Sequence, residues 1–336
     1  TEVMAGITTF MTMAYILAVN PSVLGSTGMD TTAVLLATAL ASCLGTLCMA
    51  FMANLPFALS AGMGLNAFMA YTVVAGYGYS WQVALFAVFI EGLIFIVLSL
   101  TNIREAIFNA IPLTLKKGVS VGIGLFIAFI GLQNSGLCVD SATLVTIISF
   151  PENFHTAGIC ALLTLVGLFF TAVFYARKMK GAILYGILLT WVLGMICQVT
   201  GIYVPTPDAG FYSLFPSWGM TDFSKLGLTF GQCFNLDFGA VGIVNFIVVI
   251  FSFLFVDIFD TLGTLIGVAT KAKMLDKDGH LPGIKPALLA DSIATSAGAI
   301  LGTSTTTTFV ESASGVAVGG RTGLTAMTTG ILFLLA

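Results

Sequence analysis

The sequence predicts an all-α polytopic membrane protein. Three observations support this prediction: the composition, the length of the apolar runs, and the placement of charged residues in the loops between them. Hydrophobic residues make up 58% of the 336 residues and charged residues only 8%, with a mean hydropathy of +1.05. Soluble domains carry about 25% charged residues, so the natural solvent of this chain is lipid. The net charge of -3 does not favour a nucleic-acid partner.

Eleven apolar runs are long enough to cross about 30 Å of hydrocarbon as helices. They fall at residues 4–20, 32–53, 57–75, 81–100, 115–134, 156–176, 182–200, 241–268, 285–302, 305–320 and 323–336. A short amphipathic piece between Ile103 and Leu113 is expected in the membrane interface. The proline-containing segment 201–240 is expected to be a long loop. Both ends of the chain lie at or in apolar runs, as expected of a fragment of a longer protein.

The loop charges give the orientation. If the first span starts in the cytoplasm, inner loops hold eleven of the twelve basic residues, and only Lys225 falls outside. The eleven are Arg104, Lys116, Lys117, Arg177, Lys178, Lys180, Lys271, Lys273, Lys277, Lys285 and Arg321. The outer loops carry Asp30, Asp140, Glu152, Asp208, Asp222 and Asp237. This bias follows the positive-inside rule, so we expect a plasma (inner) membrane protein with a cytoplasmic N-terminus.

An internal repeat occurs at an offset of 253 residues. Leu35-Leu36-Ala37, Ala41, Gly45 and Gly62 recur without a gap as Leu288-Leu289-Ala290, Ala294, Gly298 and Gly315. The two copies begin seven spans apart and therefore enter the membrane from opposite sides. Inverted repeats of this kind are typical of secondary transporters.

Two spans at matching places in the repeat are poor helix formers. Residues 55–66 contain Pro56 and several glycines, and residues 302–315 contain four consecutive threonines, Thr305 to Thr308. Extended backbone at membrane depth survives only when it is buried in protein or lines a cavity. A pair of interrupted spans therefore predicts the binding site. The alternative is that Gly and Thr only allow close helix packing.

Three carboxylates, Asp257, Asp260 and Glu311, lie within spans. Burying a charge in the membrane costs free energy, so an ionisable residue there is a functional candidate by default. Asp257 and Asp260 share one helical stripe with Thr261 and Thr264, and this stripe must face the protein interior. A structural role, holding the interrupted tenth span, is an equal alternative for Asp260. Glu91 and Asp291 are also expected within the membrane but nearer span ends, where capping or packing explains them equally well.

The motifs resemble those of a known family. Residues Phe255–Thr264 (FVDIFDTLGT), Gly62–Phe68 (GMGLNAF), Thr305–Ser312 (TTTTFVES) and Thr8–Tyr15 (TTFMTMAY) resemble the azaguanine-type (AzgA-like) purine permeases of the nucleobase–cation symporter group. The likeness runs along the whole chain and is closest to the bacterial guanine/hypoxanthine branch.

The resemblance implies a uracil-permease-like fold of two inverted seven-span repeats, with short β-strands in spans three and ten. It implies a core domain of residues 1–100 (spans 1–4) and 241–336 (spans 8–11, the last truncated). Residues 101–240 would hold spans 5–7 of a gate domain and the outer loop, and spans 12–14 would be absent. It assigns substrate binding to Asn66, Asp257 and Glu311, with Asp260 supporting or coupling.

The chemistry of a purine agrees with this site. The base is planar and carries N–H donors along one edge, so the two oxygens of Glu311 could accept two donors side by side. Phe68, Phe259 or Phe309 could stack on the base.

The expected function is therefore import of purine nucleobases, guanine or hypoxanthine first, by proton symport. The partners implied are the purine, the proton and the lipid bilayer, without a cofactor or metal, and a homodimer is left open. Adenine or another nucleobase is the nearest alternative. An anion transporter of the same fold is disfavoured because three carboxylates would repel its substrate. An intramembrane enzyme has only the i, i+3 aspartates in its favour, and a passive channel does not require an inverted repeat.

Overall fold

The computed structural model describes the chain except for residues 102, 104–105, 107–111, 142–143, 180–181, 208–209, 217–221, 237–241 and 277–280. Each of the eleven expected spans coincides with a helix or a group of shorter elements. Within the described residues, six helices or joined helices are long and apolar enough to cross a membrane, and three apolar helices are shorter. The interfacial piece expected after Ile103 lies mostly outside the described residues. So do five of the loop charges: Arg104, Lys180, Asp208, Asp237 and Lys277.

The described chain divides into two compact units, Thr1–Ile123 with Thr221–Ala336, and Gly124–Met220. The first unit begins with α1 (Glu2–Met13), α2 (Ile16–Gly25), α3 (Thr31–Cys48), the π-helical η1 (Met49–Ala53), β1 (Leu59–Ala61), α4 (Met63–Ala67), the π-helical η2 (Phe68–Gly76) and α5 (Trp81–Leu100). It continues with the 3-10 helices η5 (Phe223–Leu228) and η6 (Gln232–Phe234), then α11 (Ile243–Ala272), α12 (Ile284–Leu301), β4 (Thr306–Thr308), α13 (Ser312–Val318) and α14 (Gly323–Leu335). The helix α7 (Leu113–Asn134) crosses from the first unit to the second.

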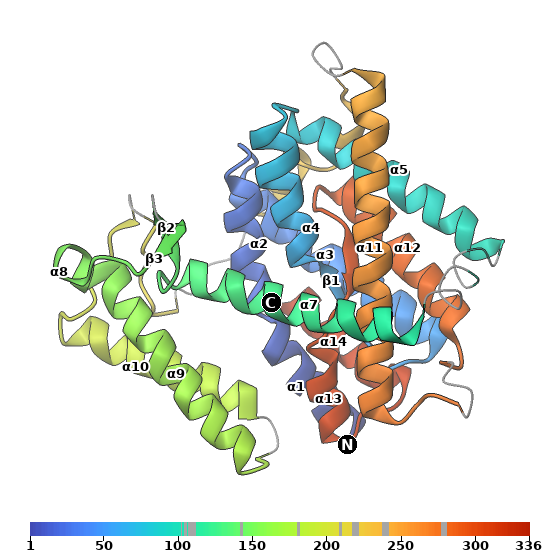
Figure 1. The fold of residues 1–336 in the computed structure, drawn as a ribbon. Helices are drawn as coiled ribbons and strands as arrows, with labels where there is room; N and C mark the ends of the chain where they lie inside the picture. Colours follow the sequence, from blue (N-terminus) through green and yellow to red (C-terminus); the bar gives the residue numbers. More distant parts are fainter. Residues whose placement is uncertain are drawn as a thin grey trace. The chain divides into compact units, whose positions relative to one another are not determined.

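The second unit contains the hairpin β2 (Val139–Ser141) and β3 (Leu144–Thr146), followed by α8 (Phe150–Asn153), the π-helical η3 (Phe154–Gly158), α9 (Ile159–Ala176) and α10 (Ala182–Val199). The last two helices lie side by side (Figure 1). The two helices approach closely at two Gly–Thr pairs. A Cβ at Gly167 would overlap Thr190, and a Cβ at Gly186 would overlap Thr171. The core and gate roles expected for 1–100, 101–240 and 241–336 stay predictions. Residues 222–236, expected with the gate, belong to the first unit.

The repeat is visible in two helices of the first unit. Helices α3 and α12 begin and end 253 residues apart, the offset that the sequence predicts, and they pack against each other. Equivalent positions of the two helices each contact the strand that follows. Ser42 of α3 hydrogen-bonds Ser60 of β1 at 2.6 Å, and Thr295 of α12 donates to the Thr306 carbonyl of β4 at 3.0 Å. Each helix thus supports the strand of its own repeat.

The two interrupted spans meet as an antiparallel pair of strands, which confirms the strands expected in spans three and ten. Leu59 pairs with Thr308 and Ala61 with Thr306. The strands are 247 residues apart, not 253, because the second copy reaches its strand in fewer residues after the helix. The ungapped match of Gly62 to Gly315 is therefore wrong. Gly62 caps the N-terminus of α4, whereas Glu311 occupies that position before α13.

Side chains satisfy the backbone that the short strands leave unpaired. The Thr46 hydroxyl receives the Leu59 amide at 2.9 Å and lies 3.1 Å from the Leu59 carbonyl. The Ala58 amide donates to Ser312 Oγ at 3.0 Å. All six strand residues are buried. This is the condition under which extended backbone persists within a membrane.

Candidate functional site

Side chains from three segments gather around the two strands. The long helix α11 lies beside β4, α4 and α13 (Figure 1) and contributes Asp257 and Asp260 from its middle. Glu311 stands between β4 and α13, and Asn66 lies in α4. The four polar residues predicted from the sequence thus lie on elements that contact or adjoin the two strands. Their roles stay predictions.

Glu311 is oriented by a residue from the first span. The break between α1 and α2 leaves Tyr15 as the N-cap residue of α2, and its hydroxyl donates to Glu311 Oε1 at 2.8 Å. The next turn of α13 is also fixed to α1, since Thr12 Oγ1 lies 2.9 Å from Ser314 Oγ. Glu311 is half-buried. Each carboxylate oxygen has two lone pairs, so the group can accept further donors after Tyr15.

Asp260 lies where the two interrupted spans approach each other. Its Oδ2 accepts a hydrogen bond from Thr307 of β4 at 3.3 Å. A Cβ at Gly62 would lie 3.5 Å from the same oxygen and 3.1 Å from Thr307 Oγ1, so glycine leaves room for this contact. Asp260 is half-buried, which gives it both a contact to the tenth span and an exposed part.

Asp257 lies deeper than its neighbour and is fully buried. Thr261, one turn along α11, lies 2.9 Å from Asp257 Oδ1 and 3.3 Å and 3.2 Å from the two oxygens of Asp291 in α12. A hydroxyl carries one hydrogen and can donate to one acceptor at a time. Two buried carboxyl groups thus face one hydroxyl, and two negative charges in this place would repel each other at low dielectric constant.

Asn66 belongs to a buried polar network that joins four spans. Its Nδ2 donates to Asn20 Oδ1 at 2.6 Å, and its Oδ1 accepts from Ser304. Asn20 Nδ2 in turn lies 2.7 Å from Thr38 and 2.9 Å from Thr303. Both ends of the Asn66 amide therefore contact the protein in this structure. The network ties the first, second and third spans to the start of the tenth.

Glu91 and Asp291 are deeper than the sequence predicted. Both lie well inside their helices rather than near the ends, and both are fully buried. Thr305 donates to Glu91 Oε2 at 2.9 Å, and Asp291 contacts Thr261. These contacts connect residues 214 and 30 positions apart, so nothing in the local sequence could indicate them. In the sequence, Tyr15 is noted only as the last residue of the Thr8–Tyr15 motif, and its contact with Glu311 is not predicted.

The three candidate aromatic residues differ in their surroundings. The Phe68 ring packs edge-on against Phe253 with centroids 5.0 Å apart. Phe309 is 6% exposed and lies in a cluster with Met13 and Ile16. Phe259 is half-buried, and it lies one residue before Asp260 in α11.

A family model described as "Permease family" matches residues 1–336. The chain belongs to this permease family. It is a transporter rather than an enzyme. The match confirms the resemblance that the motifs predicted.

Two relatives and one solved structure are similar to this permease over nearly its whole length. It is 47% identical over 345 residues to the guanine/hypoxanthine permease PbuG of Bacillus subtilis, a match that covers 100% of this chain and 74% of that protein. It is 42% identical over 340 residues to the adenine permease AdeP of Escherichia coli, covering 100% of this chain and 70% of that one. The transmembrane domain of a cyanobacterium bicarbonate transporter, BicA, matches with a TM-score of 0.60 at 16% identity, over 99% of this chain and 80% of that domain. At that identity the likeness shows the fold alone.

Proposed function

We propose that this permease imports purine nucleobases, guanine and hypoxanthine first, across the plasma membrane by proton symport, with its N-terminus in the cytoplasm. The observation that carries the proposal is the half-buried Glu311 carboxylate, held by Tyr15 at the junction of an interrupted span. An acceptor group in that place suits a neutral, planar ligand with several N–H donors. PbuG, a guanine/hypoxanthine permease by name, shares 47% of the aligned residues.

Guanine matches a carboxylate better than adenine does. Guanine presents two N–H donors side by side, at N1 and at the exocyclic amine, and a carboxylate can accept both. Adenine places an acceptor nitrogen beside its amine, and that lone pair would face a carboxylate oxygen. The 42% identity to AdeP keeps adenine as the second candidate.

We assign the proton to a pair of buried carboxylates, Asp257 and Asp291. Asp257 and Asp291 both lie within 3.3 Å of the Thr261 hydroxyl. One proton shared by this group removes the repulsion between its two charges. The complete burial of Asp257 supports a proton role, while the partial exposure of Asp260 and Glu311 suits contact with a ligand. Asn66 would act through its network, by fixing the third span against the tenth.

Uptake by a bacterium that lacks its own purine transport tests the substrate. Cells expressing the full-length protein are expected to take up labelled guanine and hypoxanthine, and excess uracil or bicarbonate should compete poorly. Preferred uptake of adenine would change only the preferred purine and would leave purine transport in place. Transport of bicarbonate without any purine uptake would overturn the proposal.

A further inference from the structure

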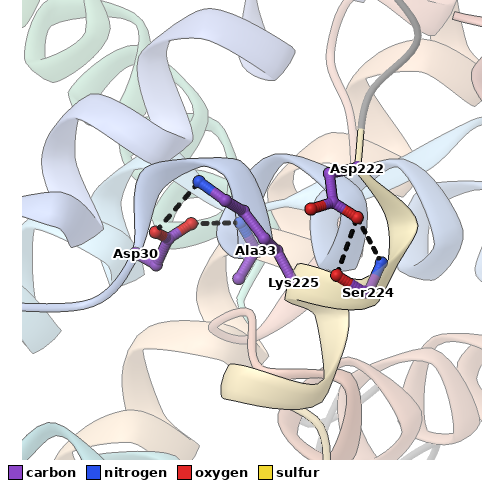
Figure 2. Close-up of polar contacts among 5 residues, drawn as sticks. All are labelled: Asp30, Ala33, Asp222, Ser224 and Lys225. Carbon is purple, nitrogen blue, oxygen red and sulfur yellow. Dashed lines mark hydrogen bonds and ion pairs between the residues drawn. The ribbon is translucent and has the colours of Figure 1, made fainter.

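The segment of residues 222–236, here called the outer segment, contains η5 and η6 and precedes α11. One end is tied to the start of α3. Lys225 Nζ lies 3.6 Å from Oδ2 of Asp30, the N-cap residue of α3, and Asp30 Oδ1 accepts from the Ala33 amide at 2.9 Å (Figure 2). Asp222 caps η5 by accepting from the Ser224 amide at 3.0 Å and hydroxyl at 2.7 Å. Lys225 and Asp30 were both expected in outer loops, and their contact agrees with a common side.

The charge on Asp30 is stabilised by these contacts. The Ala33 amide, and then Lys225, hold the pKa of Asp30 below its ordinary value. A lowered pKa means that the carboxylate stays ionised until the medium is more acidic than an ordinary aspartate requires. Asp30 therefore stays negatively charged across the neutral and mildly acidic range.

The other end of the outer segment packs on α5. Cys233 is fully buried, and the Phe234 ring meets Phe89 of α5 edge-on, with centroids 5.1 Å apart. The outer segment is thus attached to two helices of the first unit. It is more than a connection between spans.

Its middle contacts the end of α12. The last carbonyls of a helix have no partner within the helix. Thr229 Oγ1 donates to the Leu301 carbonyl at 3.0 Å, and the Gly231 amide donates to the Ile300 carbonyl at 2.7 Å. Thr229 is 1% exposed. At Gly302 the backbone turns with φ of +101°, and a Cβ there would overlap Thr229, so the outer segment fits closely against the residue where α12 stops.

The chain that leaves this point leads directly into the site. Thr303 and Ser304 join the buried network around Asn66, Thr305 contacts Glu91, and β4 follows. Glu311 comes nine residues after Gly302. A shift of the end of α12 would therefore be carried along extended backbone to the carboxylate.

We propose that the outer segment is a positioning element for the transport site, and that Thr229 is the residue through which it acts. By holding Ile300, Leu301 and Gly302 from outside the membrane, it fixes the register of the interrupted tenth span. This inference rests on the proposed purine transport. Thr229 is a positioning residue, since nine residues separate the backbone that it holds from Glu311.

The test is Thr229→Val, which replaces the donating hydroxyl by a methyl group of similar size. We expect KM for guanine uptake to rise about threefold to tenfold, the effect of one net hydrogen bond. The maximal rate per transporter in the membrane should change less than about twofold. Thr229→Ser keeps the donor and should restore KM. Thr229→Ala loses the donor without added bulk and should reproduce the rise.

The matched control is Thr101→Val. Thr101 ends α5, and its hydroxyl donates to Val97 within the same helix at 2.9 Å, so KM should not change. An unchanged KM in Thr229→Val and Thr229→Ala would overturn the positioning role. Reduced abundance of the Thr229 variants with a normal KM would also overturn it, because the hydrogen bond from Thr229 would then serve folding alone. Absence of guanine uptake by the wild-type protein would instead contradict the proposed function, and the inference with it.

Discussion

Replacing Glu311 by glutamine is expected to weaken guanine binding about ten- to a hundredfold. Hydrogen bonds to charged groups contribute about 1.5–3 kcal/mol, and the amide has one acceptor oxygen where the carboxylate has two. The hydroxyl of Tyr15, which donates to Glu311 Oε1 at 2.8 Å, can still donate to the amide oxygen. The variant should therefore keep the fold of α13 while losing the paired acceptors.

Guanine binding to purified protein, measured by isothermal calorimetry, gives the affinity directly. Glu152→Gln is the control, because Glu152 is exposed in α8 and the change removes the same charge in the unit that does not contain Glu311. Its affinity should equal that of the wild type. A wild-type affinity in Glu311→Gln, with uptake still driven by protons, would remove Glu311 from the binding site.

Replacing Asp257 by asparagine is expected to lower proton-driven uptake by about a hundredfold, as loss of about 3 kcal/mol at a buried charged group would produce. The asparagine cannot take up the proton that the Asp257, Thr261 and Asp291 group would share. Because Asp257 is fully buried, guanine binding should change much less than transport. The separation between affinity and rate distinguishes a proton role from a substrate contact.

Initial rates in energised cells, with guanine affinity measured on the same purified variant, check this expectation. Asp140→Asn is a suitable control, since Asp140 is exposed in β2. Normal accumulation of guanine by Asp257→Asn would exclude Asp257 from coupling. A loss of affinity as large as the loss of rate would return Asp257 to the substrate site, as the family resemblance implies.

Most of the span boundaries could be predicted because hydropathy fixes them. The offset of 253 residues holds for α3 and α12, where identical small residues recur at matching positions of the two helices. It fails between Gly62 and Gly315 because the second copy connects its helix to its strand with fewer residues. An ungapped comparison cannot detect that the second connection is shorter than the first, so it misaligns the residues that follow.

Individual contacts of the candidate site were predictable only between residues that are near in sequence. The stripe of Asp257, Asp260 and Thr261 follows from helical spacing. The contacts of Tyr15 with Glu311 and of Glu91 with Thr305 join residues 296 and 214 positions apart, so they depend on the tertiary fold. The outer segment was expected with the gate because it follows those spans in the chain, whereas buried contacts with α5 and α12 attach it to the first unit.

Whether purine and proton cross together can be measured with purified full-length protein in liposomes. With an inwardly directed proton gradient, labelled guanine should accumulate inside above its outside concentration, and an uncoupler should release it to equilibrium. The interior should acidify only when guanine is supplied. Guanine uptake that reaches the same level with and without the proton gradient would show that guanine and proton do not cross together.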